Sequence, residues 1–330
     1  MYNLALLGAG RIGQIHANSV SLNPDCHLKY VVDMNETVAH DTAKKFSSQV
    51  ASVDEVLNDP DIHAVLICTI TSTHADLIER SAKAGKAIFC EKPVDLSIER
   101  VNACLQVVEE TGVPLMMGFN RRFDPNFAHL KSVLDSGEIG DIELVTISSR
   151  DPQAPPASYI ESSGGMFRDM TIHDFDVARW LLAEEPISLY ATASALTSDH
   201  VKTSGDVDTA IITLTCASGK MAVITNSRRA SYGYDQRVEV HASGGMLTVN
   251  NVSESTLSIA TEKGMMSQKP MAFFLERYAA AYRQELEVFI DGLITGVENY
   301  PVGEDGRKAL LMANAACESI ATGKVIELSL

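Results

Sequence analysis

The sequence predicts an α/β protein of two domains, in which a doubly wound parallel sheet is followed by an α+β domain with a large, mostly antiparallel open sheet. Three observations predict this fold class. Strand and helix patterns alternate over residues 3–117, β-patterned runs follow one another over 187–260, and two helical segments close the chain. Alternation is typical of parallel βαβ units, and successive strands favour antiparallel pairing. We expect domains at residues 1–120 and 121–330, and the last helices can pack back on the first domain.

The elements of the first domain follow from short apolar runs, each leading into a helical pattern. We expect strands at 3–7, 28–32, 63–69, 87–90 and 114–117. Helices are expected to about residue 22, then at 36–46, 73–84 and 96–111. A further short helix before Pro60 is predicted by the capping-box pattern of Ser52 and Glu55, in which each side chain caps a backbone N–H of the other residue.

The second domain begins with a helix at about 125–136 and a strand at 142–149. A central helix follows the glycine pair Gly164-Gly165. The β-patterned runs that come next are 187–196, 209–216, 221–227, 237–241, 245–249 and 256–260, and the closing helices are 273–295 and 306–322.

Composition and charge exclude several classes of function. The formal charge of −16 and the pI near 4.9 argue against nucleic acid or an anionic membrane as a partner. The six cysteines form no C-x-x-C pair, which favours free thiols in a reducing cytosol. No apolar run approaches the ~18 residues that span a bilayer. The first strand starts at about residue 2, which leaves no room for a signal peptide, so we expect a cytoplasmic protein.

A glycine-rich turn between the first strand and the first helix predicts a dinucleotide site, and therefore a Rossmann domain. Gly8, Gly10 and Gly13 form G-x-G-x-x-G, which allows a tight turn, a close approach of the pyrophosphate and close packing of helix on strand. Asp33 follows Gly13 by 20 residues at a strand end, where its carboxylate can accept hydrogen bonds from ribose hydroxyls. A carboxylate there repels a 2′-phosphate, so NAD is favoured over NADP.

The central helix carries an acid and an imidazole together. His173 follows Asp169 by four residues, and Asp176 follows His173 by three. In a helix this spacing places all three on one face, and the opposite face is apolar. This cluster could ligate a cation, but hydride transfer to nicotinamide needs none, so we expect no metal. His173 could instead be a core histidine, although the neighbouring glycines and carboxylates favour a site.

Several motifs resemble the Gfo/Idh/MocA oxidoreductases, and among them the inositol 2-dehydrogenases. They are the glycine-rich turn, AGKAIFCEKP at 84–93, GFNRRFDPNF at 118–127, SRDP at 149–152, GGMFRDMTIHDFDVARW at 164–180, YGYDQR at 232–237 and FFLERY at 273–278. The resemblance covers nearly the whole chain. Ile70 departs from it, because the family usually has proline in that turn.

The resemblance implies a catalytic set of Lys92, Asp169 and His173, a role in inositol catabolism, and a homotetramer formed through the second domain's sheet. The implied cofactor-binding residues are Gly8, Gly10, Arg11, Ile12, Gly13, Asp33, Thr69, Thr71, His74, Glu91 and Lys92. The implied substrate-binding residues are Lys92, Arg122, Asp151, Asp169, His173, Tyr234 and Tyr278.

The chemistry of the candidate residues agrees with alcohol oxidation, which removes a hydroxyl proton while hydride leaves the same carbon. His173 can take that proton, Asp169 can hold the imidazole or a neighbouring hydroxyl, and Lys92 can stabilise the alkoxide or share the role of base. Other readings stay open for three residues: Arg122 as a surface partner of Asp124, Tyr234 as a packed strand aromatic, and His74, like His16, as a structural histidine.

The function that we predict is NAD-dependent oxidation of a cyclic polyol, with myo-inositol oxidised to 2-keto-myo-inositol (scyllo-inosose). One alternative is a related scyllo-inositol or aldose dehydrogenase. The other is a non-catalytic, NAD-binding sugar sensor of the same fold that regulates transcription. The presence of Lys92, Asp169 and His173 together counts against the sensor, since binding alone needs no positioned base.

Overall fold

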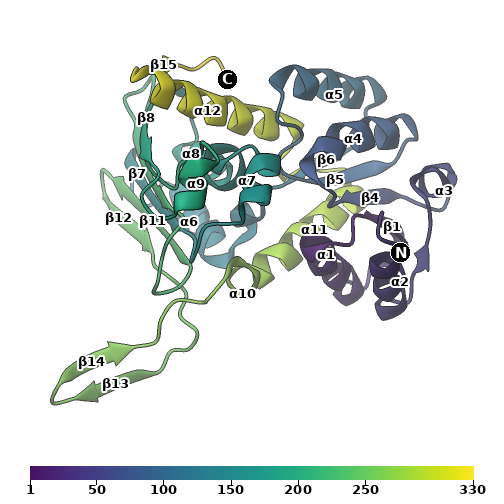
Figure 1. Ribbon diagram of the computed structural model, residues 1–330, viewed down its shortest axis with the longest axis horizontal. Coiled ribbons are helices and arrows are strands. Elements are labelled where there is room, and N and C mark those ends of the chain that lie inside the picture. The colour runs from purple at the N-terminus through teal and green to yellow at the C-terminus, as the bar shows by residue number, and fades with distance from the viewer. The chain divides into compact units, whose positions relative to one another are not determined.

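The computed structural model describes all of residues 1–330 and divides into two compact units (Figure 1). The first unit comprises Met1–Phe123 and Ala281–Leu310, and the second comprises Asp124–Ala280 and Leu311–Leu330. The first break along the chain thus falls three residues after the predicted one, and residues 281–310 belong to the first unit. No helix combines the length and the apolar character that crossing a membrane requires.

The first unit is built on a six-stranded parallel sheet of order β3-β2-β1-β4-β5-β6, which confirms the predicted doubly wound sheet. Its strands are β1 (Tyr2–Leu7), β2 (Cys26–Val32), β3 (Gln49–Val50), β4 (Ala64–Ile67), β5 (Ala87–Glu91) and β6 (Leu115–Gly118). Its helical elements are α1 (Arg11–Leu22), α2 (Glu36–Lys45), α3 (Val53–Asn58), η1 (Thr71–Thr73), α4 (His74–Lys83), α5 (Ile98–Thr111), η2 (Asn120–Phe123) and α11 (Ala279–Thr295). The predicted capping box of Ser52 and Glu55 starts α3, as its reciprocal hydrogen bonds show. The central strands β1, β4 and β5 are buried on both faces, as parallel strands between helices must be.

The second unit is built on a seven-stranded sheet of order β12-β11-β7-β10-β9-β8-β15. Every pair in it is antiparallel except β7 with β10, which confirms the prediction of a mostly antiparallel sheet. Its strands are β7 (Ile142–Arg150), β8 (Pro186–Ser194), β9 (Thr209–Cys216), β10 (Met221–Ser227), β11 (Asp235–Ala242), β12 (Gly245–Val249) and β15 (Ile326–Glu327). Its helical elements are α6 (Pro125–Ser136), α7 (Ala157–Ser163), η3 (Phe167–Thr171), α8 (Ile172–Leu182), α9 (Asp199–Thr203), α10 (Phe274–Arg277) and the end of α12 (Gly303–Thr322).

The core of the second unit lies on one face of this sheet. Alternate residues of the strands turn inward, such as Ile212 and Leu214 on β9, and they pack against Phe175 and Leu182 of α8. The residues between them turn outward, which leaves the other face open.

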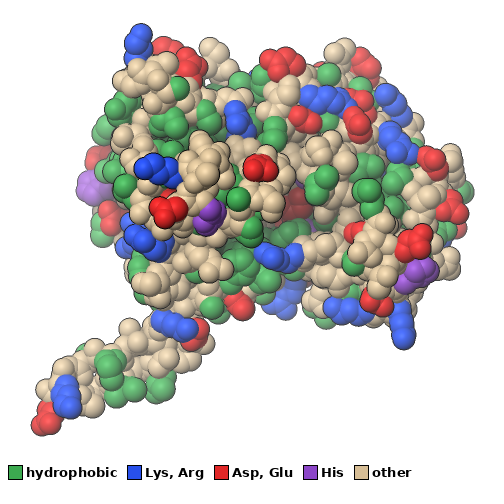
Figure 2. Space-filling model, viewed as in Figure 1, with side chains coloured by type: hydrophobic (Ala, Val, Ile, Leu, Met, Phe, Trp, Pro, Cys, Tyr) green, Lys and Arg blue, Asp and Glu red, His purple; other side chains and the backbone are tan.

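A two-stranded hairpin, β13 (Ser258–Thr261) and β14 (Gly264–Ser267), extends away from the main sheet of the second unit (Figure 1). All its residues are exposed, and hydrophobic side chains that include Leu257, Met265 and Met266 lie on its surface (Figure 2). The sequence predicted only a single strand here.

The predicted helix 273–295 is wrong in one respect, because it breaks at Tyr278 into α10 and α11.

Candidate functional site

The predicted cofactor residues gather at the carboxyl edge of the first unit's sheet. Gly8 follows β1, Asp33 follows β2, Thr69 follows β4 and Lys92 follows β5. The strand order reverses between β1 and β4. In doubly wound sheets this reversal opens the crevice in which dinucleotides bind.

The glycine loop has the backbone that a pyrophosphate requires. Gly8 has φ +94°, and a Cβ there would lie 2.7 Å from the backbone of Cys68. A Cβ on Gly13 would lie 2.0 Å from the carbonyl oxygen of Gly8, whereas one on Gly10 would meet nothing within 4 Å. Helix α1 starts here with no side-chain cap and no acid in its first turn. Its positive N-terminal end therefore faces the open space above Gly10, which fits a phosphate group.

Asp33 is held beside this loop by two backbone hydrogen bonds. Its Oδ2 accepts from Ala9 N–H at 2.7 Å, and its Oδ1 accepts from Asn35 N–H at 2.8 Å. Because each carboxylate oxygen can accept more than one hydrogen bond, ribose hydroxyls can still bind. The two hydrogen bonds thus hold the carboxylate beside the glycine loop.

Lys92 follows β5 in a turn that the sequence only partly predicts. The bond between Lys92 and Pro93 is cis, which the sequence analysis did not predict. The carbonyl of Pro93 accepts from His74 Nδ1 at 2.7 Å, and His74 Nε2 lies 3.1 Å from Thr69 O. His74 is 2% exposed, and burial lowers its pKa, while the two carbonyls that its ring nitrogens face oppose this shift. His74 therefore joins the loop after β4 to the Lys92 turn, and its predicted contact with cofactor stays a prediction.

The loop after β4 carries Thr69, Ile70 and Thr71. Thr73 donates from Oγ1 to Thr69 Oγ1 at 2.7 Å and to Ile70 O at 2.9 Å. Ile70 is 68% exposed, so the departure from the usual proline changes the surface of this loop and leaves its hydrogen bonds intact.

Asp169 of the second unit is held by two donors. Tyr159 O–H donates to Oδ1 at 3.0 Å, and Arg228 Nη2 donates to Oδ2 at 3.2 Å. The charge of Asp169, together with burial, raises the pKa of Tyr159 well above its usual range. Arg228 is 1% exposed. A buried guanidinium and a tyrosine hydroxyl thus hold the side chain of Asp169 in place.

The helical turn that carries Asp169 is a π-helix, η3, which leads directly into α8. Gly165, with φ +84°, allows the side chain of Asp206 to approach, since a Cβ at Gly165 would lie 2.8 Å from Asp206 Oδ1. Asp206 in turn accepts from the backbone N–H of Met166. The prediction that Asp169 and His173 lie on one regular α-helix is therefore wrong in detail, because Asp169 lies in a π-turn and His173 in the α-helix that follows.

Helix α8 is fixed to the sheet from below by Asp174. This fully buried carboxylate accepts from Ser149 Oγ of β7 at 2.6 Å and from Asn226 Nδ2 of β10 at 2.8 Å. His173, its neighbour in the sequence, is only half-buried. Asp176, predicted on the same face as His173, is fully buried.

The remaining predicted substrate residues lie in different surroundings. Arg122 pairs with Asp305 at 2.9 Å within the first unit. Asp124, its partner in the alternative interpretation, forms a buried ion pair with Arg277. Asp151 is half-buried, and its charge contributes to the raised pKa of Tyr159.

Tyr234 and Tyr278 are buried in the second unit, 5% and 2% exposed, with their rings packed edge to face at 6.0 Å. Tyr278 O–H donates to Gln236 Oε1 at 3.2 Å, and Gln236 Oε1 also lies 3.1 Å from Ser149 Oγ. The two tyrosines thus belong to the network beneath α8, and direct contact with substrate stays a prediction for both.

Sequence reasoning missed Tyr159 and Arg228. Tyr159 precedes Asp169 by 10 residues on a separate helix, and Arg228 follows it by 59 at the end of β10. No short motif joins them to Asp169. The only available signal was an arginine placed directly after a half-buried strand.

Known proteins match both units. Residues 2–119 match the oxidoreductase family with NAD-binding Rossmann fold, and residues 127–248 match the GFO/IDH/MocA C-terminal domain. The inositol 2-dehydrogenase of Rhizobium meliloti is 52% identical over 324 residues, which cover 98% of each chain.

Solved structures match over the same length. A myo-inositol dehydrogenase from Corynebacterium glutamicum superposes with a TM-score of 0.96 at 41% identity, covering 100% of this chain and 99% of that one. Scyllo-inositol dehydrogenase from Lactobacillus casei, solved with NAD(H) and scyllo-inositol, gives a TM-score of 0.92 at 28% identity and covers 99% of each chain.

Proposed function

The chain belongs to the Gfo/Idh/MocA family of NAD-binding oxidoreductases, and from this premise we propose that it oxidises myo-inositol to 2-keto-myo-inositol with NAD. Full-length similarity to an inositol 2-dehydrogenase is the observation that carries the proposal, because it covers both the dinucleotide fold and the unit that holds Asp169 and His173. Bound NAD supplies the hydride acceptor at its nicotinamide ring.

We assign the cofactor's pyrophosphate to the N-terminus of α1 and its ribose to Asp33. The uncapped helix end and the two anchored carboxylate oxygens support this assignment. A carboxylate at this position selects against the 2′-phosphate of NADP.

Within the proposed catalytic set, His173 takes the hydroxyl proton. Asp169 is less suited to that role, because Arg228 and Tyr159 already donate to its two oxygens. A carboxylate held by these two donors can orient the imidazole or a neighbouring hydroxyl. Lys92 supplies positive charge for the developing alkoxide.

We further propose that the protein is a homotetramer assembled through the open face of the second unit's sheet. Tyr190, Ile211, Met221 and Met246 are 39–57% exposed on β8, β9, β10 and β12. Apolar side chains gathered on an open sheet face are typical of a surface that another protein chain covers. We place the enzyme in the cytoplasm, since its six cysteines are free thiols. The similarity to inositol 2-dehydrogenases supports a role in inositol catabolism.

Initial rates of NADH formation with a panel of polyols test the function. We expect the highest kcat/KM with myo-inositol and NAD, above scyllo-inositol, glucose, galactose and xylose. Lys92→Ala and His173→Ala should lower kcat by about a hundredfold or more and leave the affinity for NAD nearly unchanged. The exposed residues Lys44 and His27 provide matched alanine controls. If NAD binds and no polyol is oxidised, the protein is a sensor and the proposal is wrong.

A further inference from the structure

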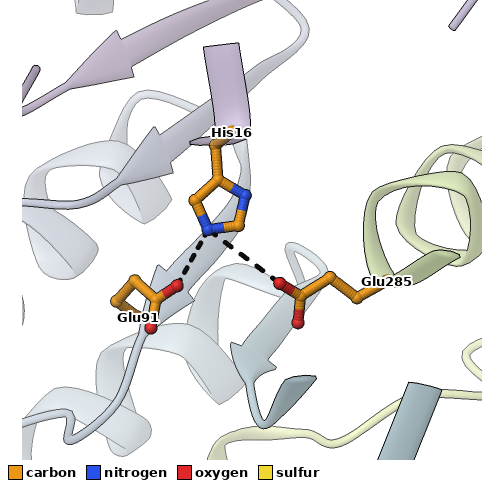
Figure 3. Close-up of side chains that lie close together, drawn as sticks. All are labelled: His16, Glu91 and Glu285. Atoms are coloured by element: carbon orange, nitrogen blue, oxygen red, sulfur yellow. Dashed lines mark hydrogen bonds and ion pairs between the residues drawn. The ribbon is translucent and has the colours of Figure 1, made fainter. Parts of the chain in front are cut away.

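A buried cluster of three titratable side chains lies next to the cofactor loops of the first unit (Figure 3). It joins His16 of α1, Glu91 at the end of β5 and Glu285 of α11. His16 Nε2 lies 2.8 Å from Glu91 Oε1 and 3.9 Å from Glu285 Oε1. The side chains of His16 and Glu285 are fully buried, and that of Glu91 is 13% exposed.

We propose that Glu285 and His16 are positioning residues for hydride transfer, which act through Glu91 to fix the Lys92 turn relative to helix α1. The inference rests on the proposed function for the reaction that it supports. Each member of the cluster belongs to a different element, so the three together join the cofactor helix, the end of β5 and the closing helix.

Glu91 is the member that transmits this constraint. It is the last residue of β5, and Lys92 follows it directly in the chain, before the cis bond to Pro93. Its carboxylate lies between His16 and β6, since a Cβ on Gly118 would lie 3.1 Å from Glu91 Cδ and Oε2. With the side chain of Glu91 held in this way, the backbone from which Lys92 starts is fixed at the end of β5.

Charge balance indicates how the cluster is protonated. Burial, followed by the charge of Glu91, raises the pKa of Glu285 well above its usual range. Burial therefore favours the neutral form of Glu285, and a hydrogen bond of 2.8 Å joins His16 to Glu91. His16 is also enclosed by the rings of Phe89 and Tyr282, with centroids at 4.7 and 5.7 Å.

A buried polar group in this position is costly for stability. Neither oxygen of Glu285 has a hydrogen-bond partner, and the nearest ring nitrogen is at 3.9 Å. Replacing such a group with an apolar side chain of similar size is often neutral or stabilising. A purely structural Glu285 would therefore tolerate methionine, whereas a positioning Glu285 would not.

The test compares Glu285→Met, Glu285→Gln and a matched control, Tyr300→Phe. Tyr300 is also buried in the first unit, and its hydroxyl has no hydrogen-bond partner. We expect E285M to fold with an unchanged or higher Tm, to bind NADH within about threefold of wild type, and to lose kcat by about tenfold or more. E285Q keeps the neutral, polar shape and should retain kcat within about twofold, as should Y300F. Full turnover in E285M would overturn the proposal.

A second readout does not depend on the substrate. Hydrogen–deuterium exchange of the NADH complex should be faster in E285M over residues 89–95, and unchanged there in E285Q and Y300F. Wild-type protein that oxidises no polyol would refute the proposed function, while this exchange result would still decide the positioning role. Metal analysis of the purified protein completes the test. A stoichiometric metal that is present in wild type and lost in E285Q would mean that His16, Glu91 and Glu285 form a metal site, and the proposal would be wrong.

Discussion

Replacing Glu285 with glutamine should change how stability depends on pH. The native carboxyl is fully buried, with its pKa raised by burial and by the charge of Glu91. In the unfolded chain the same group loses its proton near pH 4.5. A group whose native pKa is raised contributes stability that is fully present below the unfolded pKa and is lost as pH rises toward the native pKa. Wild type should therefore lose about 1.4 kcal/mol of unfolding free energy per pH unit for as long as the native side chain keeps its proton.

Glutamine does not titrate, so E285Q avoids this loss. Between pH 5.5 and 7.5 the stability of E285Q relative to wild type should rise, at about 1.4 kcal/mol per pH unit for as long as the native Glu285 keeps its proton. His16 and Glu91 face Glu285 directly, and burial raises the pKa of the nearby Cys68 thiol. All three groups are present in both proteins, so the effect of their own titration largely cancels in the difference in stability between E285Q and wild type.

Urea unfolding followed by circular dichroism at several pH values would measure this difference. Tyr300→Phe should give a constant offset over the same range, because burial raises the pKa of Tyr300 still further above neutral pH. A constant offset for E285Q as well would mean that Glu285 is ionised in the native protein, and the account of the cluster would be wrong.

Three further changes test other parts of the structure. Asp33→Ala should weaken NAD binding by about tenfold or more and relax discrimination against NADP; unchanged cofactor preference, measured as the ratio of kcat/KM values, would contradict the ribose assignment. Arg228→Met removes the guanidinium that donates to Asp169 and should cost about 2 kcal/mol of unfolding free energy. Asp169→Asn in the same chain should restore part of this loss, and an equal loss in the single and double variants would refute the coupling between Arg228 and Asp169. Ile211→Lys places a charge on the open sheet face and should raise the dissociation constant of the oligomer by about tenfold or more, measured by light scattering against concentration; an unchanged constant would move the interface elsewhere.

The sequence was sufficient for the two sheets because their signals are local. The glycine loop and Asp33 are defined by spacing alone. The alternating burial of strands such as β9 and β11 follows from the alternation of apolar and polar residues in their sequences. Burial of all four residues of β4 follows equally from its apolar run.

What the sequence did not predict depends on contacts between distant residues. Arg228 and Tyr159 meet Asp169 only after the sheet has formed, and the π-turn at η3 has no distinct periodicity. The two-residue strand β3 is too short to show any pattern. The sequence favoured a structural role for His16, but its partners Glu91 and Glu285 become visible only in the structure.

Deuterium transfer tests the central claim most directly. With myo-inositol deuterated at carbon 2, the protein should produce NADH that carries one deuterium, and initial rates should show a primary isotope effect if hydride transfer limits turnover. His173→Ala should slow this transfer strongly, and the exposed control His27→Ala should not. NADH without deuterium would show that another carbon is oxidised, and no NADH at all would contradict the assignment of the protein as a dehydrogenase of myo-inositol.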